Sequence, residues 1–410
     1  MKKSTTRYSF VYILVSMLVC FTPVKAQLSE TTPLDSIEIS LLTCTPGPVA
    51  YSMYGHSALR VNNYTDDLDL VFNYGVFDYN EDNFVFKFLK GETDYFLGAE
   101  YTQGFFDRYK EEGAGVLEQV LNLTREECNN LNALLMENLE PDNCVYRYNW
   151  LYNNCTTRAQ EMIENSIQGT VRYLAADREQ TARAILHEYN KVDRWMEFGE
   201  NFILGYELDR QLTKRQQMFI PSLFAAEVDS AVIVRHDGTT VPLVRETRHP
   251  IERTSEVRPP QFDWPMLTFV LLFVALAVVG IFELRRVKTF VWIDMVMSVL
   301  VGLAGLLITF LFFFSEHAGV DSNILVIIIN PLTFAFIPFL LRRRTQPLNY
   351  AILAVFVLFA IACFALRQSF DPALWPLALT LLLRVVVNIS VNHKKSLSLQ
   401  TKTRNHSKKS

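Results

Sequence analysis

One cysteine of the sequence stands where a thiol can act as a nucleophile. Cys155 follows the Asn-rich pair Asn153-Asn154 and opens a helix-like pattern of apolar residues that continues with Ala159 and Met162. A thiol at a helix N-terminus lies at the positive end of the helix dipole, which lowers its pKa toward the thiolate form. The spacing therefore indicates a reactive thiol, although a buried structural cysteine fits the same pattern.

A cysteine nucleophile needs a base, and histidine is the usual one. Four histidines precede the apolar last third of the chain: His56, His187, His236 and His249. His56 lies at the start of a strand-like run, which would hold its ring rigidly, whereas the others fall in a charged helix, a turn and a linker. By elimination and context we choose His56 as the base for Cys155. A buried cysteine beside a satisfied structural histidine is the alternative interpretation.

An orienting partner should bind the second ring nitrogen of His56. Asn73, on the strand that follows in the chain, is our choice for this role. Tyr74 and Asp78 are its rivals, and Asn73 would equally serve to cap a turn.

The oxyanion of an acyl-transfer intermediate needs hydrogen-bond donors. The backbone N–H of Cys155 is the natural donor, because it lies at the start of a helix. Tyr54 or Asn154 would add a side-chain donor, and Arg60 belongs to the same candidate region. Helix capping is an equally good account of Asn154. This interpretation involves neither a metal nor a cofactor.

The bulk composition separates a globular part from a membrane part. The chain has 410 residues, half of them hydrophobic, and a net charge of −4. That length favours two or three domains, and the charge gives no electrostatic case for a nucleic-acid partner. The first two thirds are typical of a soluble domain, whereas the last third is almost continuously apolar.

The N-terminus has the pattern of an export signal. Lys2 and Lys3 precede an apolar run at 10–21, and a small-residue cleavage site ends at Ala26. We therefore expect residues 1–26 to be a signal peptide, with a retained N-terminal anchor as the alternative. Lipidation of Cys20 is disfavoured, because the bulky Val19 precedes it.

Export places the remaining domain in an oxidising compartment. It carries four cysteines, Cys44, Cys128, Cys144 and Cys155, which allow three complete pairings that sequence does not distinguish. A catalytic Cys155 would have to be free.

Alternation and capping signals predict an α+β domain at 27–246. Period-two alternation indicates strands at 35–44 and 115–123, and 57–62 and 70–76 are further strand candidates. Residues 95–101 and 144–150 are predicted to be extended, and 225–244 has strand-like alternation around an Asp237-Gly238 turn. Thr124 and Glu127 form a capping-box pattern for a helix that runs to 139. Residues 247–265, rich in Pro, Arg and Glu, are predicted to be a linker.

Five apolar stretches of bilayer length follow, at 266–284, 290–314, 323–341, 348–366 and 373–391. They define an all-α polytopic membrane domain at 266–391, with a basic, disordered tail at 392–410. Basic loops remain in the cytoplasm, so we expect a periplasmic N-terminal domain, an inner-membrane location and a cytoplasmic C-terminus. His317 and Asn330 are candidates to line a headgroup cavity, and ordinary helix packing is the alternative for both. Asp294 lies near the inner end of its span, where snorkelling would explain it.

The sequence also resembles known families. The His motif upstream of the Cys motif is similar to circularly permuted papain-like folds, including the lecithin:retinol acyltransferase-like enzymes and permuted relatives of the NlpC-type peptidases. The order of signal peptide, exported His/Cys domain and five-span membrane domain resembles more closely the Lnb family, the lipoprotein N-acyltransferases of Bacteroidota. Four motifs carry the resemblance, which covers nearly the whole mature chain: Thr43-Cys44-Thr45-Pro46-Gly47, Tyr54-Gly55-His56-Ser57-Ala58-Leu59-Arg60, Phe72-Asn73-Tyr74-Gly75-Val76-Phe77-Asp78 and Asn154-Cys155-Thr156-Thr157.

This resemblance implies an acyltransferase with a Cys155–His56 dyad. The acyl chain would pass from a phospholipid donor to the Cys155 thiol, and then to the α-amine of a diacylglyceryl-cysteine lipoprotein at the membrane surface. A membrane-tethered cysteine peptidase or amidase acting on cell-wall peptides would use the same dyad, but it would need one anchor instead of five spans. A non-catalytic scaffold is the third possibility, and it would tolerate Cys155→Ala.

Overall fold

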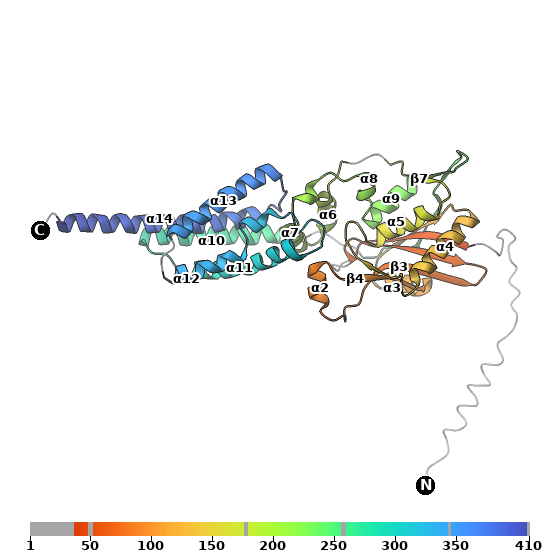
Figure 1. Ribbon diagram of the computed structural model, residues 1–410, viewed down its shortest axis with the longest axis horizontal. Helices are drawn as coiled ribbons and strands as arrows, with labels where there is room; N and C mark the ends of the chain where they lie inside the picture. The colour runs from red at the N-terminus through yellow and green to blue at the C-terminus, as the bar shows by residue number, and fades with distance from the viewer. Residues whose placement is uncertain (1–36, 48–51, 176–178, 256–259, 343–345, 408–410) are drawn as a thin grey trace, which may run out of the picture. The chain divides into compact units, whose positions relative to one another are not determined.

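The computed structural model describes residues 37–47, 52–175, 179–255, 260–342 and 346–407 (Figure 1). The predicted signal peptide, its predicted cleavage site and Cys20 lie outside these ranges.

A seven-stranded antiparallel sheet organises the N-terminal domain. Its strands, in spatial order, are β10 (Val244–Ile251), β5 (Val116–Leu121), β1 (Ile37–Cys44), β2 (His56–Asn63), β3 (Leu68–Val76), β4 (Asp94–Tyr101) and β6 (Val145–Arg147). The strands predicted from alternation are confirmed within a few residues, except that only 145–147 of the extended segment 144–150 pair. Strand β1 is buried on both faces, because β2 and β5 flank it and helices cover both sides.

Helices cover the two faces of this sheet. On one face α4 (Arg125–Leu139), α5 (Cys155–Ser166) and α9 (Pro221–Ser230) enclose the main core, which includes Leu41, Leu59, Phe72, Ile163 and Phe224. On the other face α3 (Thr102–Glu111) places Phe105 against Leu42, Ala58 and Val71. Figure 1 shows α5 and α3 on opposite sides of β3. Each fully buried large side chain contributes about 1.5–3 kcal/mol, so both layers hold the sheet.

The capping box that the sequence predicts is present at the start of α4. The Thr124 hydroxyl accepts a hydrogen bond from the Glu127 backbone N–H, and the Glu127 carboxylate accepts one from the Thr124 N–H. Glu127 also binds Arg235, so this buried carboxylate is fully paired.

Smaller elements complete the domain. They are α2 (Phe84–Lys90), β7 (Thr170–Arg172), α6 (Ala182–Asn190), α7 (Arg194–Ile203), η2 (Tyr206–Asp209), α8 (Lys214–Gln217), β8 (Val232–Val234) and β9 (Thr240–Pro242). Strands β7, β8 and β9 form a second sheet, and the predicted Asp237-Gly238 turn joins β8 to β9.

Two boundaries differ from the sequence expectation. Residues 247–251, predicted to be linker, belong to the edge strand β10 and pair with β5. An edge strand leaves one row of backbone groups unpaired and often carries charged residues, so its composition resembles that of a linker. Residues 225–230, predicted to be strand-like, are helical in α9, because Pro221 opens the helix and Phe224, Ala225 and Val228 follow at helical spacing.

The C-terminal part consists of apolar helices. They are α10 (Trp264–Arg286), α11 (Val291–Phe314), η3 (Ile324–Ile327), η4 (Pro331–Ala335), α12 (Phe336–Leu341), α13 (Gln346–Leu366) and α14 (Leu374–Ser407). Five stretches of the described residues are long and apolar enough to span a membrane, as predicted. Helix α10 packs along α14 (Figure 1). The third stretch is not one helix but the succession η3, η4 and α12.

Two expectations for this part are wrong. The basic segment predicted as a disordered tail continues α14 to Ser407, and its sequence contains neither Gly nor Pro to end a helix. Asp294 does not snorkel. It is buried and accepts a 2.8 Å hydrogen bond from Arg384, which also binds the buried Glu283 at 2.6 Å. This ion-paired group joins α10, α11 and α14.

Candidate active site

Helix α5 begins with an N-cap, Asn154, that binds the second and third backbone N–H groups of the helix. The Asn154 side chain accepts hydrogen bonds from the backbone N–H groups of Thr156 (2.9 Å) and Thr157 (3.0 Å). Its amide donates to the carbonyls of Trp150 and Phe219, so every polar atom of this buried side chain is engaged in the fold. The structure therefore uses Asn154 as a helix cap, and the N–H of Cys155 belongs to the first turn of α5, where a helix has no carbonyl of its own to accept it.

A buried contact joins α5 to β2. Ser57 Oγ lies 3.2 Å from Thr156 Oγ1, and both residues are completely buried. Because His56 and Cys155 are the residues immediately before these two, the contact sets the candidate base beside the candidate nucleophile. The two stretches predicted to meet, which lie about a hundred residues apart in the chain, are brought together in this way.

His56 is held between Cys155 and Asn73. Its Nε2 lies 3.1 Å from Asn73 Oδ1, and its ring lies close enough to the Cys155 thiol for each group to shift the pKa of the other. Since Asn73 occupies Nε2, Nδ1 is the ring nitrogen left for the thiol. By strand alternation His56 and Asn73 share the sheet face of Ala58 and Val71. A thiol, an imidazole and an amide placed in this order are able to serve as nucleophile, base and orienting group in covalent catalysis.

The electrostatics of the pair favour a thiolate and an imidazolium. Burial acts to raise the pKa of Cys155, but the His56 charge, its hydrogen bond and hydrogen bonds from the Ser57 backbone and Thr156 outweigh burial and lower it. Burial acts to lower the pKa of His56, but the Cys155 charge and hydrogen bonds with Cys155 and Asn73 outweigh that effect and raise it. The two pKa values move toward each other as an ion pair requires.

Two residues that the sequence did not suggest extend this chain of contacts. The Asn73 amide donates to Glu100 at 2.9 Å, and Arg108 donates to the same carboxylate at 2.6 and 3.0 Å. A carboxylate only accepts hydrogen bonds, so Glu100 directs the amide nitrogen of Asn73 toward itself and the amide oxygen toward His56. The contact depends on the pairing of β3 with β4 and on the position of α3, which no local motif reveals.

Tyr54 and Arg60 bind residues other than His56 and Cys155. The Tyr54 hydroxyl lies 2.8 Å from both oxygens of Glu200 and 2.9 Å from Asn190 Oδ1, so it binds α6 and α7. Arg60 forms ion pairs with Asp69 and Glu118, both at 2.7 Å, and these contacts connect β2 to the neighbouring β3 and, across β1, to β5.

His317 and Asn330 also make structural contacts. His317 Nε2 lies 2.6 Å from the Phe88 carbonyl of α2. Asn330 caps η4 through the N–H of Leu332 and donates to the carbonyls of Val326 and Ile327. Of the other rivals, Asp78 accepts a hydrogen bond from the Asn80 backbone within a turn.

The cysteines of the described chain are free: Cys44, Cys128, Cys144, Cys155 and Cys363. Cys155 thus meets the requirement for a nucleophile. No group of three or more His, Cys, Asp or Glu side chains suited to a metal occurs within the described residues.

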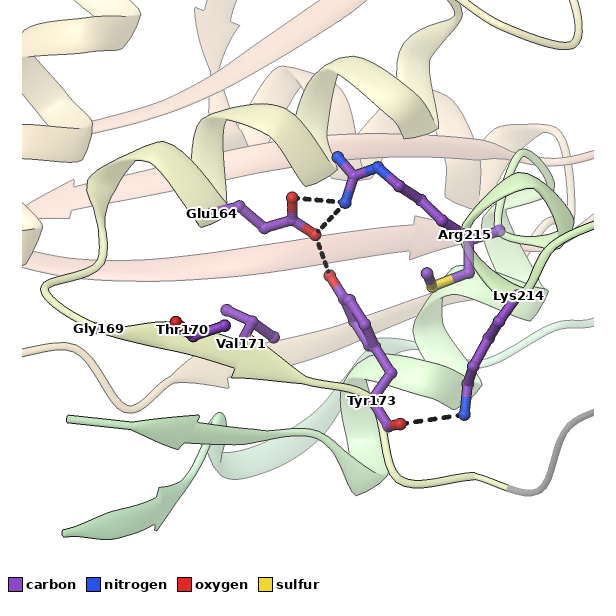
Figure 2. A pocket seen from close by; sticks show the side chains of 8 residues that line it. Glu164, Gly169, Thr170, Val171, Tyr173, Lys214 and Arg215 are labelled. Carbon is purple, nitrogen blue, oxygen red and sulfur yellow. Dashed lines mark hydrogen bonds and ion pairs between the residues drawn. The ribbon is translucent and has the colours of Figure 1, made fainter. Parts of the chain in front are cut away.

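An open cavity of about 430 Å³ lies at the other end of α5 (Figure 2). Glu164 and Arg215 pair across it, and Tyr173 donates to the same carboxylate. Lys214 binds the Tyr173 carbonyl at 3.0 Å. The charged residues and the tyrosine that line this cavity therefore bind one another. Neither Cys155 nor His56 lines the cavity, so the cavity is separate from the dyad.

Two family models match the chain. The first, the Lnb N-terminal periplasmic domain, matches residues 25–188 and includes both His56 and Cys155. The second, the Lnb transmembrane domain, matches residues 258–396 and includes the first four apolar stretches and most of the fifth, Leu374–Thr401. No curated protein and no solved structure matches the chain.

Proposed function

The chain belongs to the Lnb family, whose two domains indicate a membrane lipoprotein-processing enzyme, and from that premise we propose that it is a lipoprotein N-acyltransferase. The acyl donor is a phospholipid and the acceptor is the α-amine of a diacylglyceryl-cysteine lipoprotein. The observation that carries the proposal is the Cys155–His56–Asn73 arrangement, with a lowered thiol pKa and a free thiol.

The first half-reaction moves the acyl chain onto the enzyme. The Cys155 thiolate attacks the ester carbonyl carbon, so that a C–S bond forms and the carbonyl electrons move onto oxygen. When this oxyanion collapses, the C–O bond to glycerol breaks, and the His56 imidazolium gives its proton to the leaving alkoxide. The products are an acyl thioester on Cys155 and a lysophospholipid. Proton transfer from a positioned group of this kind typically contributes about 10²–10⁴-fold to the rate.

The second half-reaction reverses the proton flow. The neutral α-amine of the lipoprotein attacks the thioester carbonyl, and His56 takes the amine proton as the C–N bond forms. Breaking the C–S bond returns Cys155 as the thiolate beside an imidazolium, ready for another donor. Dividing the transfer into two steps is the advantage of a covalent nucleophile.

The five apolar stretches support a site of action at the bilayer. Both proposed substrates reside in the membrane surface. A catalytic domain attached to membrane spans meets them there, so neither substrate has to leave the lipid phase. The proposed orientation places the dyad domain in the periplasm and the end of α14 in the cytoplasm of an inner-membrane protein, because basic residues follow α10 and occur along the end of α14.

Expression in a strain that lacks lipoprotein N-acylation tests the proposal. We expect mass spectrometry of a lipoprotein's N-terminal peptide to show one added acyl chain with the wild-type protein and with Cys144→Ala, which changes a free thiol outside the dyad. Cys155→Ala and His56→Ala should leave the diacyl form. A diacyl form that persists with wild-type protein would overturn the proposed activity, and acylation by His56→Ala would overturn the site assignment. A peptidase or amidase would instead cleave cell-wall peptides and leave the lipoprotein unchanged.

A further inference from the structure

Tyr146, on β6, carries a buried hydroxyl group that has no role in the fold. The residue is 8% exposed, and its Oη has no hydrogen-bond partner among the described residues. Leaving a buried polar group unpaired costs about 1–3 kcal/mol, and a phenylalanine would fill the same space without that cost. The packing of the core therefore does not explain why this position carries a hydroxyl.

The hydroxyl lies beside the nucleophile, across a bulge in β3. The pairing of β3 with β4 shifts between Asn73 and Val76, and Gly75 in this bulge has φ +94°. An ideal Cβ built on Gly75 would lie 3.8 Å from the Cys155 Cβ and 3.9 Å from Tyr146 Oη, with no other atom outside its own neighbours within 4 Å. The space above Gly75 is thus bounded by the residue that attacks and by an unpaired hydroxyl.

We propose that Tyr146 is a catalytic residue whose hydroxyl donates a hydrogen bond to the oxyanion formed on the acyl carbonyl, together with the backbone N–H of Cys155. The inference rests on the proposed thioester chemistry at Cys155. Tyr146 thereby takes the role of side-chain donor for which the sequence analysis named Tyr54 or Asn154. The polar atoms of those two residues instead bind Glu200 and cap α5.

The surroundings of Tyr146 keep its hydroxyl protonated and its ring fixed. Burial, followed by the nearby Cys155 charge, raises the pKa of the phenol, so it remains a donor at neutral pH. The Arg158 guanidinium lies 4.7 Å from the ring centroid, and Tyr74 meets the ring edge-on at 6.0 Å. A donor held in place before the reaction needs no reorganisation when the charge develops.

Two other tyrosines provide matched comparisons. The hydroxyl of Tyr74 is also buried and has no hydrogen-bond partner within the described part of the chain, but the charged groups that act on it are Arg158 and Glu161 and do not include Cys155. Tyr148 is the rival donor, because it lies close enough to Cys155 to interact with the charge of the thiolate. Its ring stacks on Tyr95, with the ring centroids 4.2 Å apart.

The test measures two reactions of Cys155 in the full-length protein. In mixed micelles of detergent and phosphatidylethanolamine, the rate of acyl-Cys155 formation is followed by intact-protein mass spectrometry. Separately, iodoacetamide alkylation of Cys155 is timed. Alkylation depends on the thiolate and forms no oxyanion, so it reports whether the Cys155–His56 pair is intact. We expect Tyr146→Phe to lower the acylation rate about 10²–10³-fold, the usual loss for one oxyanion donor, and to leave the alkylation rate unchanged.

The control Tyr74→Phe should be acylated at the wild-type rate. Four other results would contradict the role of Tyr146 or the thioester chemistry on which it rests. Equal acylation by Tyr146→Phe and wild type, an equal fall in both of its rates, or a large loss confined to Tyr148→Phe would overturn the role of Tyr146. A wild-type protein that alkylates at Cys155 but never carries an acyl chain there would overturn the proposed function, and the inference with it.

Discussion

Removing the amide of Asn73 should slow acylation of Cys155 without unfolding the domain. In Asn73→Ala the imidazolium of His56 loses the acceptor that lies 3.1 Å from Nε2. The other partner of the amide, Glu100, remains bound to Arg108 at 2.6 and 3.0 Å. The substitution therefore leaves no unpaired carboxylate behind, and its effect reports the bond to His56.

The size of the effect follows from the charge on the donor. A hydrogen bond to a charged group contributes about 1.5–3 kcal/mol. At about 1.4 kcal/mol per factor of ten, Asn73→Ala should lower the acylation rate by about 10- to 100-fold. Asn73→Asp keeps an acceptor oxygen beside Nε2 and should recover part of the rate, although its second oxygen would face Glu100.

The pH dependence distinguishes an orienting role from general damage. Acylation should rise with pH through the lowered pKa of Cys155 and fall as the His56 imidazolium loses its proton at its raised pKa. The Asn73 hydrogen bond helps to raise the pKa of His56, so Asn73→Ala should move the falling limb to lower pH. Asn138→Ala, which removes a partly buried amide on α4, should change neither rate nor profile. An unchanged falling limb in Asn73→Ala would refute the reasoning.

Three further changes test other parts of the structure. Alkylation of Cys155 by iodoacetamide should begin at lower pH than alkylation of an ordinary thiol, because the His56 charge lowers the pKa of the Cys155 thiol. In His56→Ala the pH dependence of alkylation should shift to higher pH. An unshifted curve would contradict the ion pair. Gly75→Ala should abolish measurable acylation, because it adds a methyl group at φ +94° in the space beside the thiol; a wild-type acylation rate would exclude that space as the reaction site. Arg384→Met should destabilise the membrane helices by about 3–5 kcal/mol, seen as a lower Tm in detergent, because two buried carboxylates lose their partner.

The sequence predicted those features that depend on short-range patterns. The strands β1 and β2, the Thr124 capping box and the Asn154 cap are all present in the structure. Each of these features depends only on residues a few positions apart in the chain. The pairing of His56 with Cys155 was also predicted, because few histidines were available and one stood at the start of a strand.

The features that were missed depend on how distant segments meet. Glu100 reaches Asn73 because β4 pairs with β3, and the Tyr146 hydroxyl and Cys155 border the same space above Gly75, in a bulge of β3. Tyr54, two residues before His56 in the chain, was one of two candidates for a side-chain donor to the oxyanion. Its hydroxyl instead binds Asn190, which lies 136 residues away in sequence. Chain proximity indicates which residues can approach a site, but side-chain direction depends on the partners that the tertiary structure supplies.

The interrupted third apolar stretch has a consequence for how the chain enters the bilayer. An unbroken helix satisfies its own backbone, but the turns between η3 and α12 leave polar groups that hydrocarbon does not satisfy. In the folded protein α11 shields this backbone so closely that a Cβ on Gly305 would lie 2.4 Å from the Asn330 carbonyl carbon. We therefore expect this stretch to insert during synthesis only when α11 is already beside it, so that the two segments leave the translocation machinery as a pair.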